Sequence, residues 1–137
     1  MDIVILIGRI LFVAVFVGAA LGHFTNTAAV TAHTESMGLR PGRLFVIGSG
    51  IWQLAAAVLV ALGAWADLGA LMLAVFLVPT AVIMHRFWSA PDAQTKMTAQ
   101  IQFNKDISLA GAALILLGCV VTAGHSLDYT LTGPLFS

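Results

Sequence analysis

The chain has 137 residues, of which 60% are hydrophobic and only 9% are charged, and its mean hydropathy is +1.01. Charged residues make up close to a quarter of an ordinary soluble domain, so this composition excludes that class and indicates that lipid is the solvent. Six basic residues balance six acidic ones, which excludes the basic cluster that a nucleic-acid partner would require. We therefore expect membrane lipids and other membrane protein subunits as partners, and no nucleic acid.

The first apolar run, residues 3–22, contains a single charged side chain, that of Arg9. About twenty residues at a helical rise of about 1.5 Å span about 30 Å, which is the thickness of the hydrocarbon core of a bilayer. No basic segment precedes the run, and it is longer than the apolar part of a signal peptide, so we expect it to be retained as a transmembrane helix. Arg9 lies about two turns inside this helix, where a charge requires a partner.

Three further apolar runs follow, at residues 44–64, 68–85 and 107–123. The polar segment before the second run has an alanine-rich front part, residues 28–32, that suggests a short interfacial helix. The second and third runs are joined by little more than Ala66 and Asp67, so we expect an antiparallel hairpin, and Pro79 predicts a kink in the third helix. The predicted fold is all-α: a single domain, residues 1–137, that forms an antiparallel bundle of four transmembrane helices.

Basic residues indicate how these helices thread the membrane. Arg40 and Arg43 lie in the first connection, and Arg86 and Lys96 lie in the third, whereas the tails and the short hairpin turn contain no Lys or Arg. The positive-inside rule then places both basic connections in the cytoplasm and both termini outside. We expect a multi-pass protein of the plasma membrane.

Two interpretations of Arg9 stay open. At the depths that this threading gives, its guanidinium reaches the level of Gln53 near the membrane midplane, so the two side chains can form a hydrogen bond beside Trp52. Alternatively, the Arg9 side chain extends outward to Asp67, Asp2 or lipid headgroups, and Gln53 bonds a backbone carbonyl.

Polar residues also gather where the helices reach the cytoplasmic side: His23, His85, Arg86, Asn104, Lys105 and Asp106. One interpretation is structural, because Asp106 at the start of a helix is favoured by the helix dipole and Lys105 can reach headgroups. The other is a polar pocket in which His85 or His23 exchanges a proton or binds a ligand. The candidate ligand-binding residues are Arg9, Trp52, Gln53, His85 and Lys105.

The sequence contains no nucleophile with a base and an orienting group, no phosphate-binding loop and no cysteine-rich or histidine-rich metal motif. The single cysteine, Cys119, is expected to act as a small apolar side chain. We predict no catalytic residue, no metal and no resident cofactor. The polar candidate residues could bind a quinone, which is a lipophilic molecule. A haem held by His23 and His85 is disfavoured, because both histidines lie at helix ends.

Three segments resemble the DoxX family of small four-helix membrane proteins: GRILFVAVFVGAALGHF, MGLRPGRLFVIGSGIWQLAAAVLVALGAW and HRFWSAPDAQTKMTAQIQFNKDISLAGAALILLG. The sequence departs from the family pattern at Gln53, where members commonly have an acidic residue, and at His23, where they commonly have a lysine. The resemblance implies a compact four-helix bundle. Some relatives resemble the small membrane subunit of thiosulfate:quinone oxidoreductase, and others are membrane partners of redox enzymes in oxidative-stress defence.

Two functions follow as hypotheses. In the first, the chain is a non-catalytic accessory or anchoring subunit of a larger membrane complex, most naturally a redox or respiratory one, and is not an enzyme on its own. In the second, the bundle binds a quinone between its helices and takes part in electron transfer. Arg9, Gln53 and His85 would then be the polar contacts of the quinone.

Overall fold

The computed structural model describes residues 1–136, which form five α-helices and two short 3-10 helices and contain no strand. The α-helices are α1 (Asp2–Thr25), α2 (Thr27–Ser36), α3 (Gly42–Leu62), α4 (Ala66–Met84) and α5 (Ala93–Ala123). The 3-10 helices are η1 (Phe87–Ser89) and η2 (Gly124–Ser126). The all-α prediction is confirmed, and the short helix expected in the first connection is α2.

Within the described residues, four helical segments are long and apolar enough to cross a membrane: Asp2–Thr25, Gly42–Leu62, Ala66–Ser89 and Ala93–Ser126. Large apolar side chains such as Leu11, Val75 and Ile115 are exposed on the outside of these helices. A soluble protein rarely exposes so much apolar surface, whereas a bilayer accepts it. The chain is therefore a multi-pass membrane protein whose helices contact lipid, as predicted.

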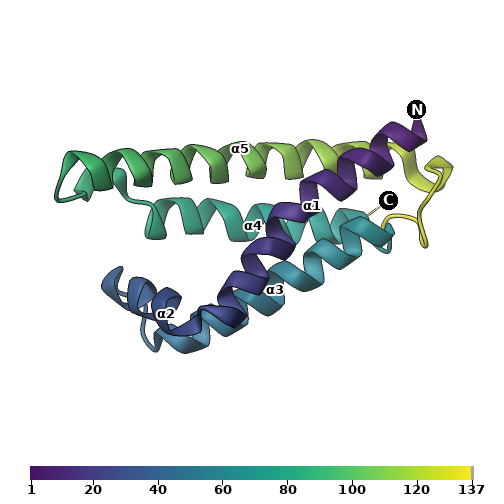
Figure 1. The fold of residues 1–137 in the computed structure, drawn as a ribbon. Coiled ribbons are helices and arrows are strands. Elements are labelled where there is room, and N and C mark those ends of the chain that lie inside the picture. Colours follow the sequence, from purple (N-terminus) through teal and green to yellow (C-terminus); the bar gives the residue numbers. More distant parts are fainter. Residues whose placement is uncertain (137) are drawn as a thin grey trace.

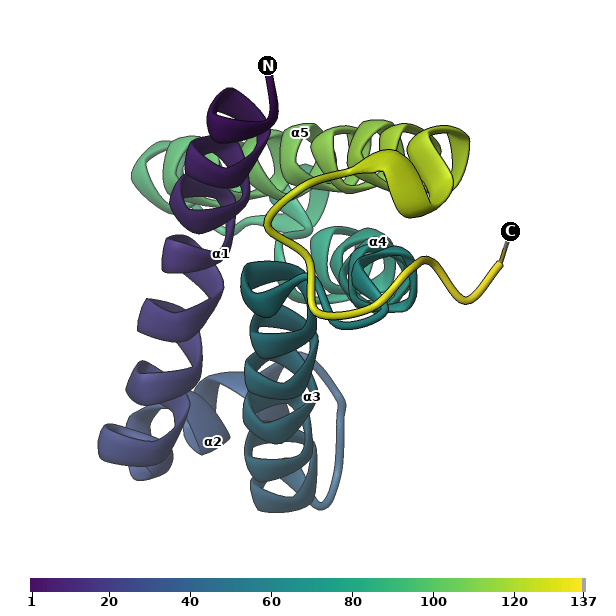
Figure 2. The same cartoon turned by 90° about the vertical axis from the view of Figure 1, so that its right-hand side faces the viewer.

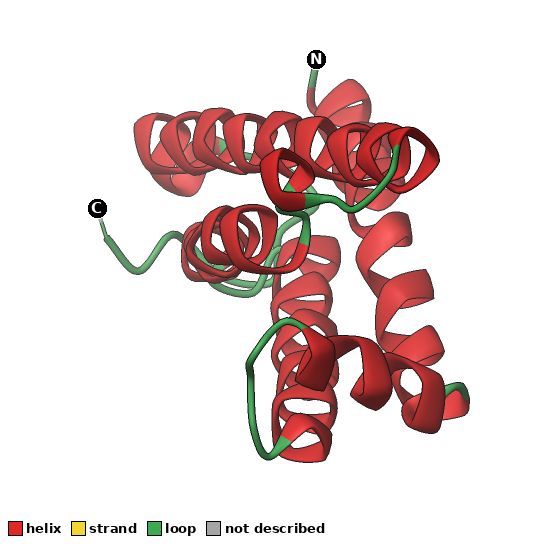
Figure 3. Ribbon diagram, turned by 90° about the vertical axis from the view of Figure 1, so that its left-hand side faces the viewer, coloured by secondary structure: helices red, strands yellow, loops and turns green. Residues whose placement is uncertain are grey.

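The four long helices form two antiparallel pairs, α1 with α3 and α4 with α5 (Figure 1). The pairs lie close together near the turn between α3 and α4, and they diverge toward the opposite end (Figure 1). Figure 2, turned by 90°, shows that the two pairs cross steeply instead of running side by side. Helix α2 packs on α3 and α1 at the divergent end (Figure 3). The bundle is thus closed at one end and spread at the other.

Helix α5 begins at Ala93, fourteen residues before the predicted start at residue 107. Asp92 caps this start, because its Oδ1 accepts from Thr95 N at 2.8 Å and its Oδ2 from Thr95 Oγ1 at 2.9 Å. These hydrogen bonds hold the pKa of the exposed Asp92 carboxyl below its ordinary value. The first turns of α5 are polar and exposed, so hydropathy alone treated this helical segment as a connection.

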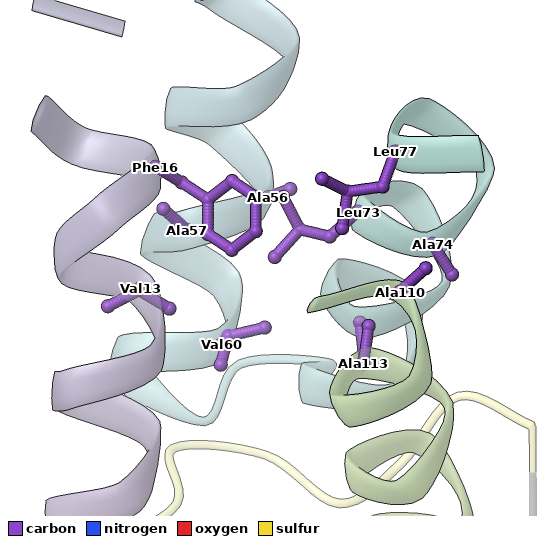
Figure 4. Close-up of a cluster of buried hydrophobic side chains, with 11 residues drawn as sticks. Val13, Phe16, Ala56, Ala57, Val60, Leu73, Ala74, Leu77, Ala110 and Ala113 are labelled. Atoms are coloured by element: carbon purple, nitrogen blue, oxygen red, sulfur yellow. The ribbon is translucent and has the colours of Figure 1, made fainter. Parts of the chain in front are cut away.

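The core is built from small side chains where α1, α3, α4 and α5 meet (Figure 4). Phe16, Leu73 and Leu77 are its large members, and alanines fill most of the remaining positions, among them Ala56 and Ala113. In lipid the hydrophobic effect does not drive helices together. Small residues let the helix backbones approach closely instead, and the van der Waals contacts between them hold the helices together.

Replacing Gly69 by alanine is expected to destabilise the bundle. A Cβ at this position of α4 would lie 2.8 Å from the carbonyl oxygen of Ala56 on α3, and a backbone atom cannot move aside without shifting its helix. We expect the free energy of unfolding to fall by about 2 kcal/mol, as for other overpacked cores. Circular dichroism during unfolding in detergent measures the change. Gly111→Ala is the matched control, since a Cβ at Gly111 meets nothing within 4 Å; equal losses in both variants would contradict the argument.

Candidate ligand-binding cavity

A cavity of about 670 Å³ lies between the two helix pairs. We call it the interhelical cavity. Its walls come from the second half of α1, the first half of α3 and the second half of α4, and residues of α2 and α5 complete the lining. Most of the lining is apolar, for example Val15, Phe16, Leu44, Phe45, Val75 and Ile83. Several of these side chains, among them Leu44, Phe45 and Val75, are exposed, so the cavity is open at the surface of the bundle.

The wall formed by α1 and α3 carries one polar group of side chains: His23, Ser49 and Gln53. His23 Nδ1 lies 3.1 Å from the carbonyl oxygen of Val46 and 3.0 Å from Ser49 Oγ. A carbonyl oxygen only accepts, so Nδ1 carries the hydrogen in the neutral ring and Nε2 is left as an acceptor. Gln53 is 3% exposed and donates from Nε2 to the Ser49 carbonyl at 3.3 Å.

The wall formed by α4 and α5 carries a second polar group: His85, Lys105 and Asp106. His85 Nε2 lies 3.4 Å from Asp106 Oδ2, and Lys105 Nζ lies 3.5 Å from Asp106 Oδ1. Asp106 is buried, whereas the Lys105 side chain is 46% exposed. The interpretation of Asp106 as a residue at a helix start is wrong, because α5 begins at Ala93. Its neighbours are the imidazole of His85 and the ammonium group of Lys105 instead of the start of a helix.

Trp52 also lines the interhelical cavity and links the two helix pairs. Its Nε1 donates to the carbonyl oxygen of Met72 on α4 at 2.9 Å. Farther along the same helix lies Pro79, which has no N–H to offer to the carbonyl of Val75, and both residues line the cavity. Thr80 Oγ1 donates to Phe76 O at 2.7 Å, so this hydroxyl does not serve the Val75 carbonyl.

Arg9 lies outside the interhelical cavity, and neither predicted contact for it forms. Its Nε donates to Val60 O at 2.9 Å, and its Nη2 donates to Ala61 O at 2.8 Å and to Tyr129 O at 2.9 Å. The physical reason is that the last carbonyls of a helix have no N–H partner within the helix, so the end of α3 offers acceptors to a buried cation. The expected bond with Gln53 is wrong, and so is the outward-extended Arg9, whose residue is only 1% exposed. Gln53 does bond a backbone carbonyl, as the second interpretation required.

The segment after η2 folds back over this closed end of the bundle. Asp67 is fully buried at the start of α4, and its Oδ2 accepts from the backbone N–H groups of Leu135 at 2.6 Å and Phe136 at 2.7 Å. Thr132 Oγ1 accepts from Trp65 N at 2.8 Å. The sequence carried no signal for these contacts, since the segment has no regular hydrophobic pattern.

The structure thus brings together four of the five predicted site residues, Trp52, Gln53, His85 and Lys105, and leaves Arg9 elsewhere. Ser49 was missed by sequence reasoning. The available signal was its spacing of four residues from Gln53, which puts both side chains on one face of a helix.

Comparison with known proteins decides the family. The model of the DoxX family matches residues 4–86, well over half of the chain. The chain belongs to the DoxX family. The match covers the helices α1 to α4 and ends just beyond His85, so most of the third resembling segment, with Lys105 and Asp106, lies outside the matched residues of this DoxX protein. No curated protein and no solved structure matches the chain.

Proposed function

We propose that this DoxX-family protein is a membrane subunit that binds a quinone-class molecule in the interhelical cavity. One observation carries the proposal: a mostly apolar cavity of about 670 Å³ has hydrogen-bonding side chains on two walls that belong to different helix pairs. Ligand sites typically combine an apolar lining with a few convergent polar groups. A quinone has an apolar ring and tail and two carbonyl oxygens, and Gln53, His85 and Lys105 offer donors for those oxygens.

In this proposal the chain is an accessory or anchoring subunit of a redox complex and does no chemistry alone. Electrons for the quinone would pass to or from a partner subunit. A surface for such a partner is offered by the first turns of α5, which are polar and exposed at Gln94, Lys96 and Gln100. These turns extend the helix well beyond its apolar part.

We place the divergent end of the bundle in the cytoplasm and both termini outside, in the plasma membrane. The support is the positive-inside rule, because Arg40 and Arg86 lie in the connections at this end, and Arg43 and Lys96 lie in the first turns of the helices that follow them. The polar groups of the interhelical cavity then lie toward the cytoplasmic side.

Titration of the protein in detergent with decylubiquinone tests the binding function. We expect saturable quenching of tryptophan fluorescence, since Trp52 lines the cavity. Most of the quenching should be lost in Trp52→Phe and kept in Trp65→Phe, because Trp65 lies in the α3–α4 turn at the closed end. Linear quenching without saturation, equal in both variants, would show that the quinone merely dissolves in the micelle and would remove the basis of the proposed function.

A further inference from the structure

His85 occupies a position between two spaces. It lines the interhelical cavity, and it also lines a groove of about 640 Å³ on the cytoplasmic side of our proposed topology. We call the latter the surface groove. Its lining includes polar residues of α2, of the link between α4 and η1, and of α5: Ser36, Arg86, Gln94, Thr95, Thr98 and Gln102. The imidazole is half-buried, with 22% of its side chain exposed. The imidazole thus lies at the boundary between the interhelical cavity and the surface groove, where His33 and Met84 also line both.

The neighbours of His85 define which of its nitrogens changes with protonation. Asp106 Oδ2 lies 3.4 Å from Nε2, and a carboxylate there favours the form in which Nε2 carries a hydrogen. The neutral ring is then an acceptor at Nδ1, and the protonated ring is a donor at both nitrogens. A ring nitrogen that changes from hydrogen-bond acceptor to donor on protonation discriminates between a ligand that donates a hydrogen bond and one that only accepts it.

Quinone and quinol differ in that way. A quinone presents carbonyl oxygens, which accept hydrogen bonds, and a quinol presents hydroxyls, which also donate. We propose that His85, held by Asp106, distinguishes the two forms: its neutral ring accepts from a quinol hydroxyl, and its protonated ring donates to a quinone carbonyl. The proposal rests on the proposed function, since it assigns a role within the same cavity.

Other titratable groups surround His85 and enter the test. Asp106 and Lys105 face it from α5, and His33 faces it from α2. Arg86 follows it in the chain and donates to Met37 O at 3.2 Å. His23 lies on the opposite wall, where Val46 O and Ser49 Oγ contact its Nδ1. A variant of each histidine is therefore needed to assign a pH trend to one ring.

The decisive experiment measures the affinity for decylubiquinone and, without oxygen, for decylubiquinol between about pH 4.5 and 7.5. Acidification that protonates His85 is expected to tighten quinone binding and to weaken quinol binding, each by about fivefold to tenfold, the net worth of one hydrogen bond. His85→Gln, which donates and accepts at every pH, should lose both trends. His125→Gln, in η2 at the other end of the bundle, should keep both.

Two kinds of result overturn the proposal. If both forms bind but their pH trends are flat or parallel, or if the trends survive in His85→Gln and vanish in His23→Gln, the assignment to His85 is wrong while the binding function stands. If neither form binds saturably at any pH, the proposed function fails and the role of His85 fails with it.

Discussion

Filling the interhelical cavity with a phenylalanine at position 48 is expected to abolish quinone binding without loosening the fold. Gly48 lies on α3 and lines the cavity, and a Cβ added there meets no atom within 4 Å. The larger side chain therefore has room to enter the space that a quinone ring would occupy. We expect the affinity for decylubiquinone to fall by about tenfold or more, since the apolar ring loses its contact area.

Gly118→Phe is the matched control. Gly118 is exposed on α5, outside the cavity lining, and a Cβ there also meets nothing within 4 Å. Both variants should unfold near the melting temperature of the parent, and only Gly48→Phe should lose saturable quenching of Trp52. Unchanged affinity in Gly48→Phe would show that the quinone binds elsewhere, and equal losses in both variants would point to a general effect of the added ring.

Arg9→Ala is expected to destabilise the bundle strongly. The guanidinium donates three hydrogen bonds, to Val60 O, Ala61 O and Tyr129 O, and alanine removes all three, so that Val60 O keeps its bond from Gly63 N at 3.3 Å but loses the charged donor. We expect the free energy of unfolding to fall by about 3 kcal/mol, because hydrogen bonds from a charged donor contribute about 1.5–3 kcal/mol each and some of that gain offsets the cost of burying the charge. Unfolding in detergent, followed by circular dichroism, measures the loss.

Two further variants make the Arg9 prediction specific. Arg9→Lys keeps the charge but has no planar fork of donors, so it should recover only part of the stability. Arg43→Ala removes an exposed arginine and should change the stability little. The segment that contains Tyr129 should become more sensitive to chymotrypsin in Arg9→Ala. A stable Arg9→Ala protein with a protected segment would show that these hydrogen bonds contribute little.

Hydropathy was sufficient to predict the transmembrane part of the fold. The runs at residues 3–22, 44–64 and 68–85 agree with α1, α3 and α4 within a few residues, because a helix in lipid must be apolar along its whole spanning length. The start of α5 could not be found in this way. The helix begins at Ala93 with exposed and mostly polar side chains, and only the cap at Asp92 marks its beginning.

The candidate site was predictable in part for a related reason. Gln53 and His85 stand out as polar residues in apolar runs, and both line the interhelical cavity. The partner of Arg9 could not be deduced, because every helix ends in free carbonyls and the sequence does not say which end a buried cation reaches. Asp106 was assigned to a helix end because the preceding turns of α5 were not recognised.

The backbone hydrogen bonds at the closed end have a mechanical consequence. Leu131 N donates to Leu62 O and Thr132 N donates to Gly63 O, each at 3.2 Å. Asp67 accepts from the backbone of Leu135, so the C-terminal segment is bound to the α3–α4 turn. At the divergent end, the Arg86 side chain donates from Nη2 to Met37 O at 3.2 Å and so ties the residues after α4 to those after α2. Backbone hydrogen bonds hold the closed end and a side chain holds the divergent end, so differences in ligand size would be accommodated at the divergent end.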